Sequence, residues 1–195
     1  MREATEDAAA SATTARIARR VHALRQQRGL SLEGLSERCN VSKSMISLIE
    51  RGESSPTAVV LERLAAGLGV ALASLFDDDA APPSPLSRRD DQLQWRDPAS
   101  GYVRRNLSPP NHVSPLQLVA VELPPGARVM YDSVARATEL HQQVLVLDGV
   151  VEATSGGDVV RLEAGDCLAM RLDRNNGYRN PGRKTARYIV AIATR

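Results

Sequence analysis

A short run of hydroxyl and basic side chains offers the clearest chemistry in this sequence. The run lies within VSKSMISLIER, over residues 41–51, and its polar members are Ser42, Lys43, Ser44, Ser47 and Arg51. On a helix over 43–51, Ile46 and Ile49 would face a core and leave the polar members outward. Short hydroxyls permit close approach to base edges, and cations contact phosphates. We therefore expect these five residues to form a DNA-binding surface.

Two short helices joined by a tight turn would position this surface. Ser31 is a suitable N-cap for a helix that runs to about Cys39, and Asn40 tolerates the left-handed conformation that ends a helix. Ser42 can cap the second helix, which Gly52 stops. These are the dimensions of a helix-turn-helix. The alternative is a helical bundle whose polar face is merely solvated.

Residues 14–76 resemble the lambda-repressor-like helix-turn-helix domains of bacterial XRE-type regulators. The resemblance rests on the stretches IARRVHALRQQRGLSLEGLSE, VSKSMISLIERGESSP and LERLAAGLGVALASLF. It implies a five-helix bundle that reads bases through its third helix. The residues that match are Lys43, Ser44 and Ser47 for base contacts and Arg51 for the DNA backbone. One position departs from the family, because Leu32 stands where a Gln usually touches phosphate.

The net charge of +2 averages over unlike segments, because residues 13–76 carry nine basic and five acidic side chains. A moderately basic domain suits contact with phosphates. We expect residues 1–12 to be a disordered tail and the acidic, proline-rich residues 77–87 to be a semi-rigid linker. Three further basic residues are phosphate candidates or, alternatively, solvated surface groups: Arg20, Arg25 and Arg28.

The chain also lacks several features that would point elsewhere. No apolar run approaches the roughly 20 residues that span a bilayer, and the acidic N-terminus does not resemble a secretory signal. Cys39 and Cys167 lie far apart, which excludes a disulfide framework and a CxxC zinc site. We therefore expect a cytoplasmic protein without membrane contact.

Beyond residue 87 the apolar pattern changes from the period of helices to that of strands. Short alternating or apolar runs are separated by turn signals such as PPG, DG, GG and NPG. The expected fold class is α+β in two domains, with residues 88–195 forming an all-β domain. This domain resembles a cupin, a double-stranded β-helix barrel. VLVLDGVVEA is similar to the end of the first cupin motif, at Gly149, and LEAGDCLAM to the start of the second, at Gly165.

The cupin resemblance also implies where a metal would bind. The matching positions are Gln142 for the usual Glu, Ala135 and Ala137 for two His (Arg136 and Thr138 in the shorter-spaced motif), and Asn176 for the last His. Transition metals prefer imidazole, thiolate or carboxylate ligands, and none of these residues supplies one. We therefore expect no metal, no other cofactor and no catalysis. His141 and Glu139 could still form a rearranged metal site.

Polar side chains around the same end of the barrel could bind a ligand instead. The candidates are Gln142, Arg171, Asn176 and Tyr178. The parity of the strand over 142–147 turns Gln142 inward with Val144 and Val146. An inward Arg171 would suit a small anion through a bidentate carboxylate contact, or it could snorkel from a surface strand. Alternatively, these polar groups satisfy one another, or the barrel serves only for dimerisation.

Together these inferences describe a transcriptional regulator. We expect a homodimer that binds a double-stranded DNA operator and senses a small-molecule effector, since one small module buries too little surface for operator-grade affinity. The effector would change the spacing of the two DNA-binding domains through the linker. The rivals are a constitutive repressor whose β domain only assembles the protein, and a metal-dependent cupin enzyme that carries a DNA-binding domain.

Overall fold

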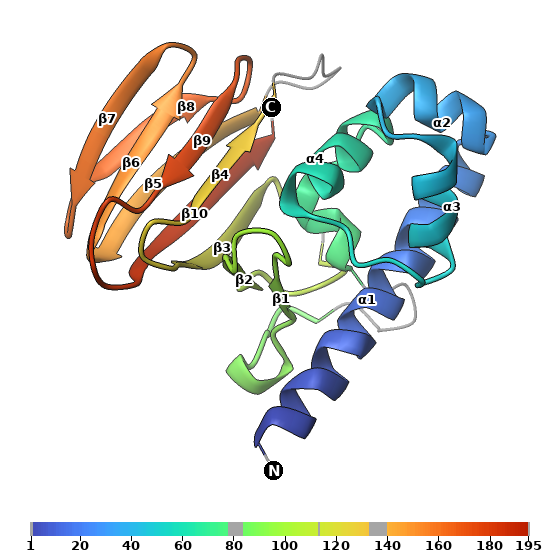
Figure 1. Ribbon diagram of the computed structural model, residues 1–195, viewed down its shortest axis with the longest axis horizontal. Coiled ribbons are helices and arrows are strands. Elements are labelled where there is room, and N and C mark those ends of the chain that lie inside the picture. Colours follow the sequence, from blue (N-terminus) through green and yellow to red (C-terminus); the bar gives the residue numbers. More distant parts are fainter. Residues whose placement is uncertain (1, 78–83, 113, 133–139, 195) are drawn as a thin grey trace.

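The computed structural model describes residues 2–77, 84–112, 114–132 and 140–194. A helical part on one side packs against a β part on the other (Figure 1). The helices of the described residues are α1 (Arg2–Gln27), α2 (Leu32–Cys39), α3 (Lys43–Glu50), α4 (Ala58–Gly67) and the 3-10 helices η1 (Leu72–Phe76) and η2 (Arg89–Asp91). In the part of the chain so described, no helix combines the length and apolarity that a membrane span requires.

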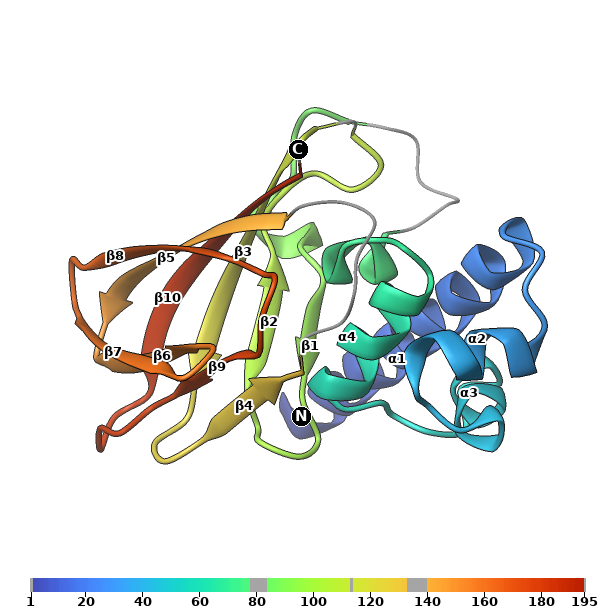
Figure 2. The ribbon, with the colours of Figure 1, turned by 90° about the horizontal axis from the view of Figure 1, so that it is seen from above.

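The helix-turn-helix forms at the predicted capping residues. Ser31 accepts a hydrogen bond from the backbone N–H of Gly34 at 3.0 Å, and Ser42 accepts one from that of Met45 at 3.2 Å. Between them Asn40 takes the left-handed conformation, with φ of 51°, and turns the chain from α2 towards α3. Both helices lie on the side of the helical part that faces away from the sheets (Figure 2).

The apolar spacing of the helices produces one tightly buried core. Each of its central side chains is at most 1% exposed: Ile17, Val21, Leu35, Ile46, Ile49, Leu61, Leu64 and Leu68. Full burial of such a side chain contributes about 2 kcal/mol. Because Ile46 and Ile49 point inward, the rotation of α3 about its axis is fixed, and its polar residues face solvent.

Two helical predictions differ from the structure. In place of a fifth α-helix the chain forms η1, a 3-10 helix, because the five-residue segment before Asp77 supports only a short turn. The described bundle therefore has four α-helices and not five. Also, α1 begins at Arg2, where the sequence predicted a disordered tail over 1–12. That stretch is rich in alanine, the strongest helix former.

The β part consists of two sheets that face each other (Figure 2). Their strand orders are β1-β2-β3-β10-β5-β8 and β4-β9-β6-β7, and the paired strands are antiparallel. The strands are β1 (Gln94–Arg96), β2 (Val103–Asn106), β3 (Leu116–Leu123), β4 (Arg128–Tyr131), β5 (Leu140–Asp148), β6 (Val150–Ser155), β7 (Asp158–Glu163), β8 (Cys167–Arg171), β9 (Asn176–Arg179) and β10 (Ala186–Thr194).

Strand β5 has the inward parity that its sequence predicts. Gln142, Val144 and Val146 are buried, whereas Leu145 and Leu147 are exposed on the opposite face. Strand β5 lies between β10 and β8 in the six-stranded sheet. Its inner residues therefore point into the space between the two sheets.

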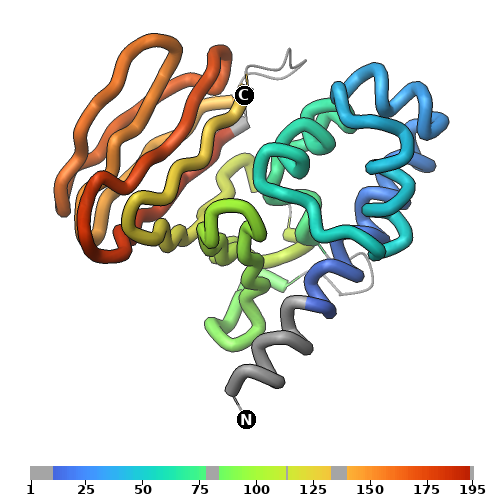
Figure 3. The backbone as a smooth tube through the Cα atoms, in the orientation of Figure 1, coloured from blue at the N-terminus to red at the C-terminus, as the bar shows by residue number. Residues whose placement is uncertain are grey.

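The helical and β parts touch directly. The backbone N–H of Ala58, the first residue of α4, donates to Asp97 Oδ1 at 2.9 Å. Near the middle of α1, the Thr13 hydroxyl donates to the carbonyl of Gln94 in β1 at 3.2 Å. Figure 3 follows the chain through this region, where α1 passes beside β1. Most of the predicted linker, residues 78–83, lies outside the described residues. The observed connection between the helical and β parts is therefore the interface made by these contacts of Ala58 with Asp97 and Thr13 with Gln94.

Candidate DNA interface and internal cavity

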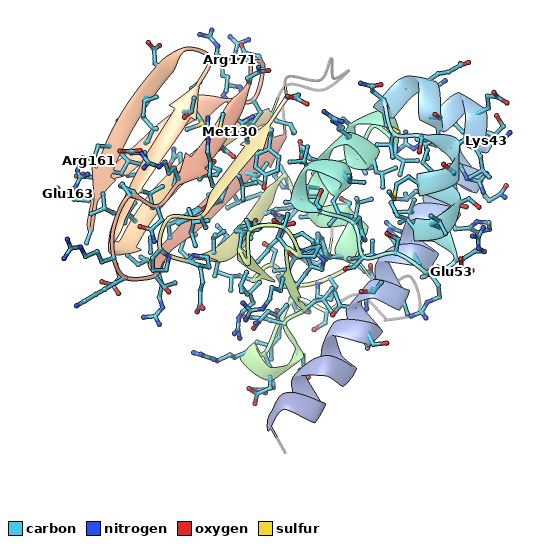
Figure 4. The ribbon with its side chains drawn as sticks, in the orientation of Figure 1. Lys43, Glu53, Met130, Arg161, Glu163 and Arg171 are labelled. Carbon is cyan, nitrogen blue, oxygen red and sulfur yellow. The ribbon has the colours of Figure 1, made fainter. Side chains whose placement is uncertain are left out.

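The first turn of α3 presents polar side chains on the outer side of the helical part, where Figure 4 labels Lys43. Ser42, Lys43 and Ser44 are exposed, and Ser47 is half-buried one turn further along. The Ser42 hydroxyl caps α3 and lies 3.2 Å from the Ser44 hydroxyl. The structure thus brings the predicted hydroxyls together around one exposed helix N-terminus.

Arg51 joins the same surface, but its guanidinium already has partners. Its Nη1 donates to the Ser47 hydroxyl, and its Nε and Nη2 donate to the two oxygens of Glu53 at 2.7 and 2.8 Å. The hydrogen bond with Glu53 raises the pKa of Arg51, and the same bond lowers the pKa of Glu53. Arg51 therefore carries a full charge, but a DNA phosphate would have to compete with Glu53 for it.

Lys43 is held more loosely. Its Nζ lies 3.5 Å from Glu33 Oε2, and the two side chains are 60% and 72% exposed. Exposed pairs of this kind contribute little to stability and are screened by salt. The Lys43 ammonium can therefore leave Glu33 for a base edge or a phosphate at small cost.

Two of the three additional arginine candidates have structural roles. Arg25 is only 7% exposed and binds Glu50, the last residue of α3. The Arg20 Nε donates to the carbonyl of Ser74 in η1 at 3.0 Å. Arg25 and Arg20 therefore hold the helices of the bundle together, and their contact with phosphates stays a prediction. The sequence did not indicate that the acid in ISLIER would pair with α1.

A cavity of about 50 Å³ lies inside the β part, next to the helical part. One water needs roughly 10–15 Å³ on this measure, so the cavity has room for about four. Three predicted ligand residues line it: Gln142 from β5, and Asn176 and Tyr178 from β9. The sequence missed the remaining polar lining, which comes from Glu62, Tyr102, Arg104, Tyr131 and Tyr188.

Arg104 of β2 supplies the buried cation of this cavity. The residue is 5% exposed, its Nε donates to Asn106 Oδ1 at 3.2 Å, and its guanidinium carbon lies 5.5 Å from the centre of the Phe76 ring. Among the described residues, nothing accepts a hydrogen bond from its Nη2. Strand alternation in GYVRRN could have indicated this residue, because Tyr102 and Arg104 share a parity.

The phenols around the cavity are neutral hydrogen-bonding groups. Burial raises the pKa of Tyr178, although a hydrogen bond from Gln142 works in the other direction. Burial also raises the pKa of Tyr131 and Tyr188 well above the usual range. The Gln142 side-chain amide donates to the Tyr178 hydroxyl. Two of the predicted ligand residues therefore hydrogen-bond to each other, which agrees in part with the alternative that these polar groups satisfy one another.

The structure does not bring Arg171 to this cavity. Its side chain is 58% exposed at the outer end of β8, where Figure 4 labels it, and pairs with Asp173 at 3.1 Å. Strand register explains the difference. Gln142 stands opposite Met170, so Met170 shares its inward face, and Arg171, opposite His141, points away. Arg171 instead borders a separate, open depression with Asp173 and Arg174, and of the other predicted ligand residues only Gln142 also reaches it.

The positions implied for a cupin metal offer no converging ligand set within the described residues. No group of three His, Cys, Asp or Glu side chains lies close enough there to hold a metal ion. Gln142 and Asn176, which stand at two of the ligand positions, supply neutral amides, the chemistry that transition metals bind poorly. Residues 135–138 and Glu139 lie outside the described residues, so a site made by His141 and Glu139 stays untested.

The fold and the exposed α3 define a class, the helix-turn-helix proteins, and comparison agrees. Residues 21–75 match the helix-turn-helix family HTH_3. The regulator SutR of Escherichia coli (strain K12) is 31% identical over 170 residues, which cover 87% of this chain and 89% of SutR. The chain therefore belongs to the family of HTH-type transcriptional regulators.

Two solved structures are similar to this chain. An HTH_3 family transcriptional regulator from Vibrio cholerae has a TM-score of 0.75 and 27% identity, over 94% of this chain and 97% of that one. The Cupin_2 domain of an XRE family transcriptional regulator from Enterobacter cloacae has a TM-score of 0.43 and 20% identity, over 47% of this chain and 95% of that domain.

Proposed function

We propose that this HTH-type regulator binds a specific operator as a homodimer and senses a small anion in a cupin-type β barrel. The observation that carries the proposal is the exposed first turn of α3, held away from the sheets by a buried apolar face. Lys43, Ser44 and Ser47 are the base-reading residues. Ser42 caps the helix beside the DNA, and Arg51 contacts the backbone.

The dimensions of α3 suit the major groove. The groove is about 12 Å wide and admits a helix whose N-terminal residues face the base edges. One such module buries too little surface for operator-grade affinity, so two copies on half-sites about one helical turn apart are proposed. The protein would act in the cytoplasm, where its DNA is.

The β domain is proposed to sense and not to catalyse. The predicted ligand residues Gln142, Asn176 and Tyr178 are neutral groups that can orient a ligand but do not provide an acid–base pair. We propose that it works without a metal or other cofactor. Metal analysis of the purified protein should find no stoichiometric transition metal. One ion per chain that is lost on His141→Ala would support the rival enzyme.

DNA recognition is tested by selecting bound duplexes from a random library. The wild type should enrich one two-fold symmetric sequence, and Lys43→Ala or Ser44→Ala should lower its affinity for that sequence about 5- to 150-fold, since one base contact contributes about 1–3 kcal/mol. Lys184→Ala, an equal charge change on the exposed surface of the β part, is the matched control. If the α3 variants enrich the same sequence with unchanged affinity, the base-reading assignment is wrong.

Sensing is tested by thermal unfolding of the full chain. A ligand that binds only the folded state raises Tm. Acetate or pyruvate should raise the Tm of the wild type and of Arg171→Ala, whose side chain lies outside the cavity. The rise should be smaller in Tyr178→Phe. If neither carboxylate raises the Tm of the wild type, the scaffold-only repressor becomes the better account.

A further inference from the structure

The internal cavity is closed by side chains from both parts of the molecule. Glu62 of α4 and the pair Ala71 and Leu72 at the start of η1 line it from the helical side, and Arg104 lines it from β2. A ligand there would contact the DNA-binding half directly. We propose that Arg104 binds a small carboxylate in this cavity and that the ligand acts on the helical part through η1. This proposal rests on the sensory function proposed above.

The unpartnered Nη2 of Arg104 favours an anionic hydrogen-bond acceptor. Arg104 is a permanent cation at 5% exposure, and no described residue, Glu62 included, accepts a hydrogen bond from its Nη2. Leaving a buried guanidinium N–H without an acceptor is costly, and the planar guanidinium fork matches a carboxylate. The phenols of Tyr131, Tyr178 and Tyr188 remain protonated, so they can donate to the same anion.

The size of the cavity limits the anion. Its volume of about 50 Å³ holds about four waters, which corresponds to an organic acid of a few heavy atoms. Glu62 gives the helical side of the cavity a carboxylate, and this group has an interaction of its own. An anion of higher charge would be repelled by Glu62 more strongly. A monocarboxylate such as acetate therefore fits better than phosphate.

Arg104 is also linked to the helical part by two routes. Its Nε donates to Asn106 Oδ1 at 3.2 Å, and the Asn106 amide donates in turn to the carbonyl of Ala73 in η1 at 3.4 Å. Its guanidinium carbon lies 5.5 Å from the ring centre of Phe76, the last residue of η1. A carboxylate that draws the guanidinium into the cavity would change both contacts.

The helix η1 passes this change to the DNA-binding bundle. Arg20 of α1 donates to the carbonyl of Ser74 in η1 at 3.0 Å, and η1 packs against both α1 and α4. We infer that η1 takes one position with the carboxylate bound and another without it. If these positions place the helical bundle differently, the affinity for the carboxylate and the affinity for DNA are linked. The linkage is reciprocal, because each ligand changes the affinity for the other by the same factor.

Binding is measured by calorimetry on the full chain, with acetate, inorganic phosphate and methylammonium as probes. Acetate should bind, and methylammonium, a cation of similar size, should not. Arg104→Gln should weaken acetate at least about tenfold, as expected for loss of a charged hydrogen bond. Arg104→Lys keeps the charge and provides a second folded variant if Arg104→Gln unfolds. Arg105→Gln is the matched control, because Arg105 neighbours Arg104 on β2 but bonds Gln94 outside the cavity.

These outcomes decide the ligand assignment. Acetate that binds the wild type and Arg105→Gln but is weakened in both Arg104 variants supports it. Equal acetate affinity in the Arg104 variants and the wild type overturns it, as does preference for methylammonium. Tighter binding of phosphate than of acetate would replace the carboxylate with an inorganic oxyanion.

Coupling is measured as the change in affinity for the selected DNA duplex when acetate is added at saturation. The wild type should change by at least about fivefold, the lower range for allosteric coupling. Asn106→Ala, which cuts the route from Arg104 to Ala73 but leaves the contact with Phe76, should reduce that factor at least about twofold while acetate affinity stays within about threefold. If acetate binds the wild type but does not change its affinity for DNA, the proposed coupling through η1 is wrong, while the assignment of Arg104 as the carboxylate-binding residue stands. Failure to select any DNA sequence would instead refute the proposed function, whatever acetate does.

Discussion

The guanidinium of Arg25 and the carboxylate of Glu50 form a two-point ion pair between α1 and the end of α3. Nε lies 2.6 Å from Oε1, Nη2 lies 2.8 Å from Oε2, and the side chains are 9% and 7% exposed. Nδ1 of His22 lies 2.8 Å from Oε2, and Arg25 Nη1 donates to the carbonyl of Leu30 at 2.9 Å. This buried pair therefore joins the end of the proposed recognition helix to α1, in addition to the apolar contacts of Ile46 and Ile49.

Replacing Glu50 with Gln should lower the free energy of unfolding by about 3 kcal/mol, because it leaves the buried Arg25 guanidinium without a counter-charge. Equilibrium urea unfolding followed by circular dichroism measures the change. The matched control is Glu53→Gln, which breaks the exposed pair with Arg51 and should alter stability far less. Equal losses in the two variants would show that burial of the Arg25–Glu50 pair contributes nothing.

The same pair should make stability depend on pH. Burial raises the pKa of Glu50, but hydrogen bonds from Arg25 and His22 outweigh it, so the pKa lies below its ordinary value of 4.5. The stabilisation is therefore complete above the unfolded-state pKa and is lost as pH falls through the folded-state pKa. Urea unfolding from pH 7 to pH 3 should show the gap between wild type and Glu50→Gln shrinking below about pH 4.5. A gap that is unchanged at pH 3 contradicts this account.

Glu53 should weaken DNA binding, because its carboxylate holds the Arg51 guanidinium and adds negative charge beside the phosphates. Glu53→Gln is expected to raise affinity for the selected duplex about 3- to 10-fold, with a larger gain at low salt. Fluorescence anisotropy at two salt concentrations measures it. Glu163→Gln, on β7 beside Arg161, is the control for losing one exposed acid far from α3 (Figure 4). If both variants gain equally, net charge and not Arg51 explains the effect.

Local signals predicted the elements that carry the site. Ser31, Asn40 and Ser42 fix the helix-turn-helix because capping depends on neighbouring backbone groups, which are set by the sequence itself. The inward parity of β5 at Gln142 follows for the same reason, since alternation along a strand is local.

The charged residues were harder to place, because their roles depend on which elements pack together. Arg171 has apolar neighbours on both sides, and only the pairing of β8 with β5 shows that it faces outward. Arg104 is buried because β2 lies against η1, at a distance of about thirty residues along the chain. Arg25 likewise finds Glu50 only when α1 and α3 pack. The composition and spacing of residues within one segment therefore could not predict these partners, which lie on other segments.

Asp97 should control how firmly the two parts are joined. It is 3% exposed, its Oδ1 accepts from the N–H of Ala58 at 2.9 Å, and its Oδ2 accepts from the N–H of Ser100 at 2.9 Å. Its charge also lies at the N-terminus of α4, where the helix dipole favours an anion. Asp97→Ala should therefore cost about 2 kcal/mol and speed hydrogen exchange in the first turn of α4.

The exposed Asp91→Ala is the control for this change. It should leave both stability and exchange unaltered, because its side chain lies on the surface at the end of η2. Asp97→Ala should also reduce the effect of acetate on DNA affinity, since α4 lines the cavity through Glu62 and is tied to the β part through Ala58. If the variant loses stability while exchange in α4 stays slow, Asp97 stabilises only its own turn with Ser100. The interface between the helical and β parts would then depend on other contacts.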